Sequence, residues 1–406
     1  MCWIYSYGSI SRVYRSSPDL KVIVLDDIVL RTSNLHYTYP DGARALNGID
    51  FEARRCKKTA IIGPNGSGKS TLFLHFNGLY RPTAGAVYVN GAEITDKNID
   101  TIRRTVGLVF QDPDDQLFAP TVRDDVAFGP ANLGLSGYEI ETRVEDVLTM
   151  LGISDLRDRN VDNLSGGQKK TVAIAGVLAM EPDIIVLDEP TSGLDPESTT
   201  EIVEITEELT AAGKSIIIST HDVDLALSWA DEIYVLKSGT VYRSGTPREI
   251  FGDKKLIGET KLRFPTVTKT FIEFKNRKIL DCTGCTMPRD VLDLVDGFDK
   301  NEHVHGRIDV IRVVRGAIDM AAICSAVRNR DFDRIGAMGT LSKAVAVELG
   351  ITCDYSTDVI QSAISAAVRG LNVLVLASGG MADLVLSRVS ERNTRDGQQI
   401  ECEIIL

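Results

Sequence analysis

The chain has 406 residues, of which 43% are hydrophobic and 25% are charged, so it is long enough for two or three domains and has a globular composition. Its 45 basic and 57 acidic residues give a net charge of -12, which argues against nucleic acid as a partner, because binding a phosphate backbone needs a basic surface. The seven cysteines are odd in number and scattered, which favours a reducing environment over a disulfide-stabilised secreted fold.

Residues 1–27 are expected to form a flexible N-terminal extension. They lack the basic start and continuous apolar segment of a secretion signal, because Asp26 and Asp27 interrupt the apolar run around them. Elsewhere no apolar stretch reaches the roughly 18 to 20 residues that a membrane span requires. We therefore expect no transmembrane helix.

Apolar strand-length runs alternate with amphipathic stretches from about residue 28 to 260. This alternation predicts an α/β domain with a largely parallel sheet. Looser sequence with glycine and proline near residues 245–265 suggests a boundary, after which the alternation resumes. We predict a first domain over residues 28–262 and a smaller α/β accessory domain over 263–406, for which we consider a regulatory role.

A glycine-rich loop occupies positions 63–71. It reads Gly63-Pro64-Asn65-Gly66-Ser67-Gly68-Lys69-Ser70-Thr71, fits the pattern G-x-x-x-x-G-K-[ST] and follows an apolar run. Its N–H groups and the helix that starts there are expected to surround nucleotide phosphates, with Lys69 at the β and γ oxygens and Ser70 at Mg²⁺. The alternative is a glycine-rich turn with a surface lysine.

A second anion site is indicated by the segment Leu164-Ser165-Gly166-Gly167-Gln168. Ser165 is placed to cap a helix that runs to Ala179, which leaves N–H groups near the two glycines accessible. Taken alone, the segment could be an ordinary turn before a helix.

Two acidic residues end a buried strand. The run from Ile184 to Leu187 is apolar on both faces, and Asp188 and Glu189 follow it at the edge where doubly wound sheets bind ligands. We expect Asp188 to hold the Mg²⁺ shell and Glu189 to act on the attacking water. Acidic residues commonly end a strand, and only the phosphate loop upstream favours this interpretation.

Residues 164–168 resemble the signature sequence of ABC transporter ATPases and lie between the other two motifs in the order of that family, so we call the helix that they begin the signature helix. The resemblance covers about residues 30 to 255. The resemblance implies a P-loop NTPase fold, namely an ABC cassette with a mixed sheet core and a helical subdomain, that binds ATP and Mg²⁺. It also implies that residues 165–168 contact the γ-phosphate of a nucleotide held by another protomer. Two ATP molecules would then join a head-to-tail dimer.

The resemblance assigns roles to further residues. Gln111 resembles the loop glutamine that reports on the metal and on a transmembrane partner, residues 192–195 the loop that links the two sites, and His221 the switch histidine at the γ-phosphate. The implied catalytic residues are Lys69, Gln111, Glu189 and His221, and the implied metal ligands are Ser70, Gln111 and Asp188. For each single residue the alternative is a loop amide or a helix cap.

Tyr39 begins a turn and resembles the aromatic residue that stacks on adenine in this family. Tyr37, on the same face of the strand, is the second candidate. An exposed strand tyrosine without a ligand is the alternative.

Residues 110–130 carry the subgroup similarity. The segment Phe110-Gln111-Asp112-Pro113-Asp114-Asp115-Gln116-Leu117-Phe118 and its continuation look like the energy-coupling factor importers, particularly their cobalt and nickel ATPases. Thr171 departs from the family pattern, because an arginine usually stands at this place on the signature helix. The change could slow hydrolysis or alter a partner contact.

These similarities imply an ATPase that powers import of cobalt, nickel or another micronutrient. It would act as a homodimer, or as a heterodimer with a paralogous ATPase, docked on integral membrane transporter subunits at the cytoplasmic face of the cell membrane. Residues 116–118 could anchor such a subunit or pack within the helical subdomain. The alternative is a soluble ABC ATPase that drives a non-transport machine, and a GTPase is disfavoured because no Asn-Lys-x-Asp motif occurs.

The C-terminal sequence offers weaker signals. Glycine-rich junctions at 336–339 and 378–380 could bind an anion, such as a regulatory metabolite, although tight turns are the favoured interpretation. Cys282-Thr283-Gly284-Cys285 has the spacing of a metal or redox site that His303 and His305 could complete. Ordinary loop residues are the favoured interpretation here too.

Overall fold

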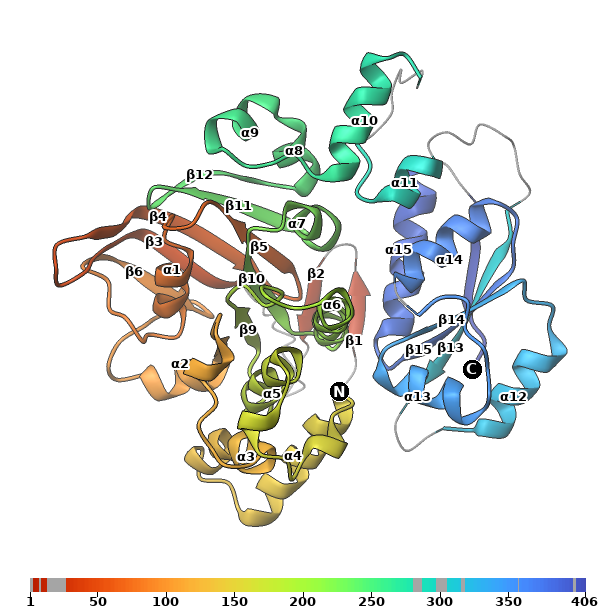
Figure 1. The fold of residues 1–406 in the computed structure, drawn as a ribbon, viewed down its shortest axis with the longest axis horizontal. Coiled ribbons are helices and arrows are strands. Elements are labelled where there is room, and N and C mark those ends of the chain that lie inside the picture. The colour runs from red at the N-terminus through yellow and green to blue at the C-terminus, as the bar shows by residue number, and fades with distance from the viewer. Residues whose placement is uncertain are drawn as a thin grey trace, which may run out of the picture.

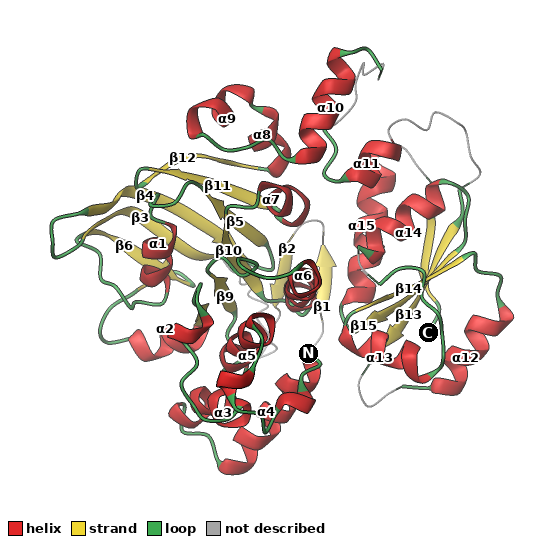
Figure 2. Cartoon of the chain, viewed as in Figure 1, coloured by secondary structure: helices red, strands yellow, loops and turns green. Residues whose placement is uncertain are grey.

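The computed structural model describes residues 3–6, 9–12, 27–279, 287–296, 305–314, 318–356, 358–396 and 399–406. Their strands form one six-stranded sheet, two four-stranded sheets and a two-stranded hairpin. Figures 1 and 2 show two of the larger sheets together in one part of the molecule, and the third in a smaller unit at the C-terminal end.

The six-stranded sheet has the order β12-β11-β5-β10-β9-β8. Its strands are β5 (Lys58–Ile62), β8 (Val106–Val109), β9 (Ile184–Leu187), β10 (Ser215–Thr220), β11 (Glu232–Lys237) and β12 (Thr240–Gly245). All neighbours pair in parallel except β11 and β12, which are antiparallel. The expected central strand β9 is buried along its whole length, as its continuous apolar run requires.

A four-stranded antiparallel sheet, in the order β4-β3-β6-β7, covers one face. It comprises β3 (Ile28–Thr38), β4 (Arg44–Arg54), β6 (Ala84–Val89) and β7 (Ala92–Glu93). Ile184 and Val186 of β9 lie in the hydrophobic cluster that joins this sheet to helix α1 (Lys69–Phe76). The alternate residues Ile185 and Leu187 point into the core on the opposite face, as the two-residue period of a strand dictates.

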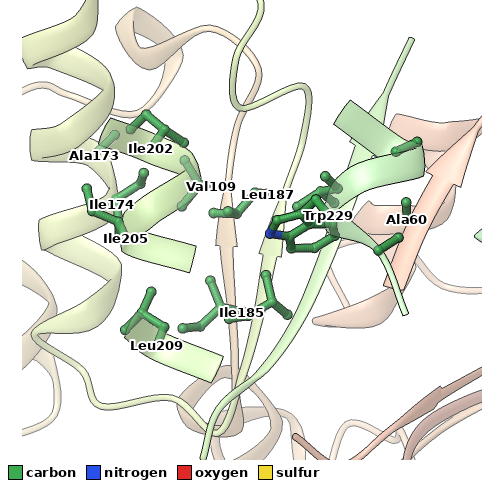
Figure 3. Close-up of a cluster of buried hydrophobic side chains, with 14 of the residues drawn as sticks. Ala60, Val109, Ala173, Ile174, Ile185, Leu187, Ile202, Ile205, Leu209 and Trp229 are labelled. Carbon is green, nitrogen blue, oxygen red and sulfur yellow. The ribbon is translucent and has the colours of Figure 1, made fainter. Parts of the chain in front are cut away.

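Helices α5 (Gly166–Leu178), α6 (Pro196–Ala211) and α7 (Val223–Trp229) pack on that opposite face. Figure 3 shows Ile174, Ile205 and Leu209 on the helices directed at Ile185 and Leu187. The indole N–H of Trp229 donates to Thr206 Oγ1 at 2.8 Å, so the large aromatic side chain is buried with its polar atom satisfied. Helix α2 (Ile99–Thr105) leads into β8.

The helical subdomain lies between β8 and α5 in the sequence. It contains α3 (Val122–Asn132), α4 (Gly137–Met150) and the short 3-10 helices η1 (Pro113–Asp115), η2 (Ser154–Leu156) and η3 (Val161–Asn163). Helix α4 begins with a capping box in which Ser136 and Glu139 satisfy each other's backbone N–H groups. Apolar residues of α3 and α4 join the core cluster beneath α5, so the subdomain is held to the signature helix.

Between β12 and β13 the described residues form four helices: α8 (Pro247–Gly252), α9 (Lys254–Thr260), α10 (Thr266–Asn276) and α11 (Val291–Asp296). Val267 and Phe271 of α10 and Leu294 of α11 belong to the core cluster of the first unit. Packing with the ATPase-like core therefore extends past residue 262, and the boundary at 262/263 stays a prediction.

The C-terminal unit has a fully parallel sheet in the order β14-β15-β13-β16. Its strands are β13 (Arg307–Val313), β14 (Arg334–Met338), β15 (Val373–Ser378) and β16 (Glu401–Ile404). Helices α12 (Met320–Asn329) and α13 (Thr340–Glu348) pack on one face, and α14 (Val359–Val368) and α15 (Met381–Asp396) on the other. It is a small doubly wound α/β unit, as the alternation of apolar runs predicts.

The N-terminal extension, predicted to be flexible, contains a short β-hairpin. Strands β1 (Trp3–Ser6) and β2 (Ser9–Arg12) pair as an antiparallel hairpin.

None of the helices in the described ranges is long and apolar enough to cross a membrane. The predicted architecture, a unit with a mixed sheet core and a helical subdomain followed by a smaller α/β unit, is confirmed.

Candidate active site

The phosphate loop (63–71) connects β5 to the start of α1. Gly68 lies just before α1 with a φ of 104°, a left-handed conformation, and a Cβ there would approach Ala45 O to 2.9 Å. Ser67 Oγ is buried without a hydrogen-bond partner among the described residues, and Lys69 Nζ donates to Gly63 O at 3.0 Å. An unpartnered hydroxyl beside a buried ammonium suits phosphate oxygens.

The phosphate loop lines a cavity of 590 Å³ together with residues distant in the sequence. The lining includes Lys69, Gln111, Glu189 and His221, so all four predicted catalytic residues reach one space. Residues 65–71 all contribute to the lining. This grouping is what a nucleotide bound at the carboxyl edge of the sheet would need.

Glu189 lies between two cationic or ionisable partners. Its Oε1 is 3.4 Å from Lys69 Nζ, and its Oε2 is 2.5 Å from His221 Nδ1. The carboxylate is 8% exposed, whereas the His221 side chain is 64% exposed. A carboxylate oriented from both sides and close to an exposed imidazole can accept or position a proton at a bound water.

Ser219 was not anticipated, yet it supports both acidic residues. Its hydroxyl donates to Asp188 Oδ1 and accepts the backbone N–H of Glu189 at 2.9 Å. Ser219 is fully buried on β10, next to β9. Glu189 has a φ of 47°, a conformation that costs energy for a non-glycine residue, and the Ser219 contact helps to hold it. The signal in the sequence is a polar residue that ends the apolar run of β10, two positions before His221.

The predicted metal ligands Ser70, Gln111 and Asp188 line a neighbouring cavity of 690 Å³. Hydroxyl, amide and carboxylate oxygens are hard donors of the kind that Mg²⁺ takes, usually one or two from protein while phosphates and waters supply the rest. No group of three or more histidine, cysteine or acidic side chains able to hold a metal occurs in the described residues. The residues present therefore fit a metal that is shared with phosphates.

Tyr39 directly follows β3 and begins the turn that leads to β4. Its hydroxyl is 2.8 Å from Thr71 Oγ1, in the last position of the phosphate loop. The ring of the second candidate, Tyr37, stacks on Tyr80 with centroids 5.1 Å apart, so one face of it is already covered. Contact with the phosphate loop favours Tyr39 for the adenine, which stays a prediction.

The signature segment (165–168) opens α5 with a capping box. Ser165 Oγ accepts the N–H of Gln168 at 3.2 Å, and Gln168 Oε1 accepts the N–H of Ser165 at 3.0 Å. A Cβ on Gly166 would meet no atom within 4 Å, so the backbone there is open to a ligand. The segment lines neither of the two cavities next to the phosphate loop. One copy of the chain does not bring it to its own phosphate loop.

Two other predicted elements take the structures that the alternatives named. Asp195, in the loop 192–195, caps α6 by accepting the N–H of Ser198 at 2.9 Å. Asp222, which follows His221, caps α7 in the same manner. These caps do not exclude the roles implied by family resemblance, which stay predictions.

Thr171 is buried and its hydroxyl donates to Gly167 O at 3.1 Å within the same helix. It therefore makes a local helix contact in the position where the family usually has an arginine. Lys170, its neighbour, reaches the segment around Gln111 instead.

The two glycine-rich junctions of the C-terminal unit both face α6. The N–H of Thr340, after the first junction, donates to Glu208 Oε1 at 2.8 Å, and a Cβ on Gly380, in the second, would lie 2.6 Å from Ala211 O. Both junctions therefore allow close approach to α6. The Cys282–Cys285 pair and His303 lie outside the described residues, so the metal or redox site considered there as an alternative to ordinary loop residues stays untested.

Comparison with known proteins gives consistent matches. The family model described as "ABC transporter" matches residues 46–192. An energy-coupling factor transporter ATP-binding protein from Methanospirillum hungatei is 41% identical over 382 residues, which are 92% of this chain and 95% of that protein. That match extends through the C-terminal unit.

Solved structures of ATP-binding cassettes also match part of the chain. One from Clostridium perfringens, described as part of the ABC transporter complex cbiONQ, is 44% identical with a TM-score of 0.53, and the match covers 61% of this chain and all of that one. A dimeric ATP-binding cassette in a post-hydrolysis state, bound to ADP and Pi, is 31% identical with a TM-score of 0.50, and the match covers 54% of this chain and 99% of that one.

We predict that Ser219→Ala lowers kcat for ATP hydrolysis by about ten- to a hundredfold, because Asp188 and Glu189 lose the hydroxyl that positions both of them. Steady-state phosphate release with Mg-ATP measures this effect. Ser215→Ala is the matched control, since Ser215 is a buried serine at the other end of β10 that accepts the N–H of Cys56. Both variants should lose about 1 to 3 kcal/mol of stability. Equal kcat values for the two variants would contradict a positioning role.

Proposed function

The chain belongs to the ABC transporter family, among the energy-coupling factor transporter ATP-binding proteins, and from this premise we propose that it powers import of cobalt, nickel or another small micronutrient. ATP hydrolysis coupled to transport is the activity of this family. The observation that carries the proposal is the convergence of Lys69, Glu189 and His221 in one cavity beside the phosphate loop. Identity of the cargo rests on subgroup similarity alone, because no cassette residue is placed to read it.

Family resemblance, supported by the geometry, assigns a chemical role to each residue. Lys69 neutralises the β and γ oxygens, and Glu189 positions the attacking water in line with the γ-phosphate. His221, hydrogen-bonded to Glu189 and exposed on its other side, contacts the γ-phosphate. Ser70, Gln111 and Asp188 would hold Mg²⁺, which neutralises charge on the phosphate oxygens when bound.

The active site is proposed to be completed by a second protomer. The signature segment presents open backbone at the start of α5 but does not line the cavities of its own chain. A head-to-tail dimer places this helix N-terminus against the γ-phosphate held by the partner. Both halves of the composite site occur in this chain, so a homodimer suffices, and a paralogous partner would serve equally.

We predict that Glu189→Gln forms an ATP-dependent dimer and hydrolyses ATP at least a hundredfold more slowly, because nucleotide still binds while the water is no longer activated. Size-exclusion chromatography with light scattering, with and without Mg-ATP, measures the dimer. Adding Gly166→Arg, which puts a bulky side chain on the open backbone of the signature segment, should abolish it. If the Glu189→Gln single variant stays monomeric with ATP, the shared-site hypothesis is wrong.

A membrane partner needs an apolar contact on the cassette. Of residues 116–118, only Phe118 offers one: it is 64% exposed and packs edge-on against Phe128, itself 48% exposed, at 4.6 Å between ring centroids. The Gln116 side chain turns inward to Ala173 O, and Leu117 packs against the core. We infer that the Phe118–Phe128 pair docks on the membrane subunit from the cytoplasmic side.

We predict that Phe118→Ser reduces co-purification of integral membrane subunits from detergent-solubilised membranes at least fivefold, because it removes the apolar anchor. Tyr138→Ser is the control, since Tyr138 is 82% exposed on α4 of the same subdomain without belonging to the pair. Recovery of ribosomes or DNA in place of membrane proteins would favour the alternative, a soluble ABC ATPase that drives another machine.

We propose that the C-terminal unit regulates hydrolysis through α6 and α7. Glu208 accepts the N–H of Thr340 at the start of α13, and Glu204, one turn earlier on α6, pairs with Lys343 at 2.5 Å. Burial raises the pKa of both carboxyl groups, while the contacts with Thr340 and Lys343 oppose that rise. Burial of these carboxyl groups offsets part of the stabilisation that the two contacts give the interface.

The segment that leads to the C-terminal unit also holds α7. Arg289 donates to the carbonyl oxygens of Leu227, Ser228 and Ala230, at the C-terminal end of the helix that follows His221. At the other end, the N–H of Thr266 donates to Asp224 Oδ1 at 2.6 Å. Helix α6, which follows the linking loop, thus contacts the C-terminal unit, and α7, which follows His221, contacts the segment that leads to that unit.

We predict that Glu208→Arg releases the C-terminal unit from α6 and raises the basal ATPase rate about fivefold, because an arginine opposes both the α13 N-terminus and Lys343. Hydrogen exchange of the α13 amides should accelerate in parallel. Glu348→Arg, an equal charge change at the exposed C-terminal end of α13, is the control. Faster exchange with an unchanged rate would show that the unit docks but does not regulate.

A further inference from the structure

Lys170 is a buried lysine on the signature helix. Its side chain is among the largest fully buried ones, at 1% exposed, and no carboxylate lies within 4.0 Å of its ammonium in the described residues. The Nζ atom donates instead to two backbone carbonyls, those of Phe110, at 3.2 Å, and Gln111. A buried ammonium without a paired carboxylate is costly, so the position calls for an explanation.

The two acceptors begin the segment that carries the metal-site glutamine. We call residues 110–116 the glutamine loop, which follows β8 and contains Gln111. Two other residues of the loop contact α5: Gln116 Nε2 donates to Ala173 O, and Asp114 pairs with Lys169 at 2.6 Å. Within the loop, Gln116 Oε1 accepts the N–H of Phe110. Lys170 is the buried contact that acts on Gln111 itself.

The ammonium also lies in the electrostatic field of the catalytic carboxylates. Burial lowers the pKa of Lys170, and the negative charges of Asp188, Asp112 and Glu189 act in the opposite direction. Carbonyl oxygens only accept hydrogen bonds, so the site needs a donor, and an ammonium supplies up to three. Thr171 cannot replace it because its hydroxyl is directed at Gly167 O.

Lys170 lies five residues after Ser165, a rise of about 7.5 Å along the helix axis. A shift or rotation of the signature end of α5 therefore moves the ammonium, and with it the backbone of Gln111. In the dimer proposed above, the signature end contacts the partner's nucleotide, whereas Gln111 lies at the nucleotide of its own protomer. The same rigid helix thus spans both sites of the dimer.

We propose that Lys170 is a positioning residue that couples the two nucleotide sites, by fastening the glutamine loop to the helix that senses the partner's γ-phosphate. The inference rests on the proposed composite dimer. It assigns to Lys170 no contact with substrate. Its effect is to make the placement of Gln111 depend on occupancy of the opposite site.

The test uses the full-length protein with Mg-ATP and three variants. In Lys170→Met, a side chain of similar length that cannot donate, the Hill coefficient for ATP should fall toward about one and kcat about tenfold, while the KM changes less than about twofold. Lys170→Arg retains a buried donor and should restore most of the cooperativity. Recovery by arginine separates donation to the loop from the mere filling of space.

Lys58→Met is the matched control for loss of a buried lysine. Lys58 is 2% exposed on β5, pairs with Glu207 and lies over the Trp229 ring, away from the glutamine loop. It should lower the melting temperature as Lys170→Met does and leave the Hill coefficient unchanged. If the two variants lose cooperativity equally, or if folded Lys170→Met retains it, the coupling role is overturned.

The Glu189→Gln variant separates failure of this inference from failure of the proposed function. If it dimerises with ATP while Lys170→Met retains cooperativity, only the coupling role is wrong. If it stays monomeric with ATP, the composite dimer and the coupling role fall together.

Discussion

The parallel pairing of β5, β10 and β9 is the constraint on which the active site depends. In the observed register Ile62 lies opposite Thr220, and Ile218 lies opposite Leu187, so the three strands end at the same edge of the sheet. Functional residues directly follow each strand: the phosphate loop follows β5, Asp188 and Glu189 follow β9, and His221 follows β10. Backbone hydrogen bonds between buried strands therefore place side chains that are far apart in the sequence within contact distance.

The features of this arrangement that depend on local sequence pattern could be predicted from the sequence. Continuous apolar runs followed by glycine or acidic residues predicted the strand ends. The phosphate-loop motif predicted the role of Lys69, and the buried strand before Asp188 and Glu189 predicted that both lie at the ligand-binding edge of the sheet. Ser219, Lys170 and Glu208 could not be assigned in this way, because each one acts on an element that is distant in the sequence. Their importance follows from which strand or helix lies beside them. The local sign for Ser219 is limited to a polar residue at the end of the β10 apolar run, and Lys170 and Glu208 have none.

Contacts between distant segments also bear on features that the sequence left open. In residues 116–118 an exposed anchor was considered, but the backbone turns the Gln116 amide toward α5, which leaves Phe118 to face solvent. The boundary at residue 262 marked a change of local composition, whereas the packing of Phe271 and Leu294 depends on a core built by the first unit. Glycine-rich junctions in the C-terminal unit looked like turns, and their closeness to α6 could be seen only in three dimensions.

The ion pair between Lys69 and Glu189 has a consequence for how substrate arrives. A phosphate oxygen that approaches the ammonium competes with a carboxylate already bound there at 3.4 Å, so nucleotide enters by exchanging one counter-ion for another. The carboxylate displaced in that exchange is the proposed base. Nucleotide binding and release of the proposed base from Lys69 would thus be a single event.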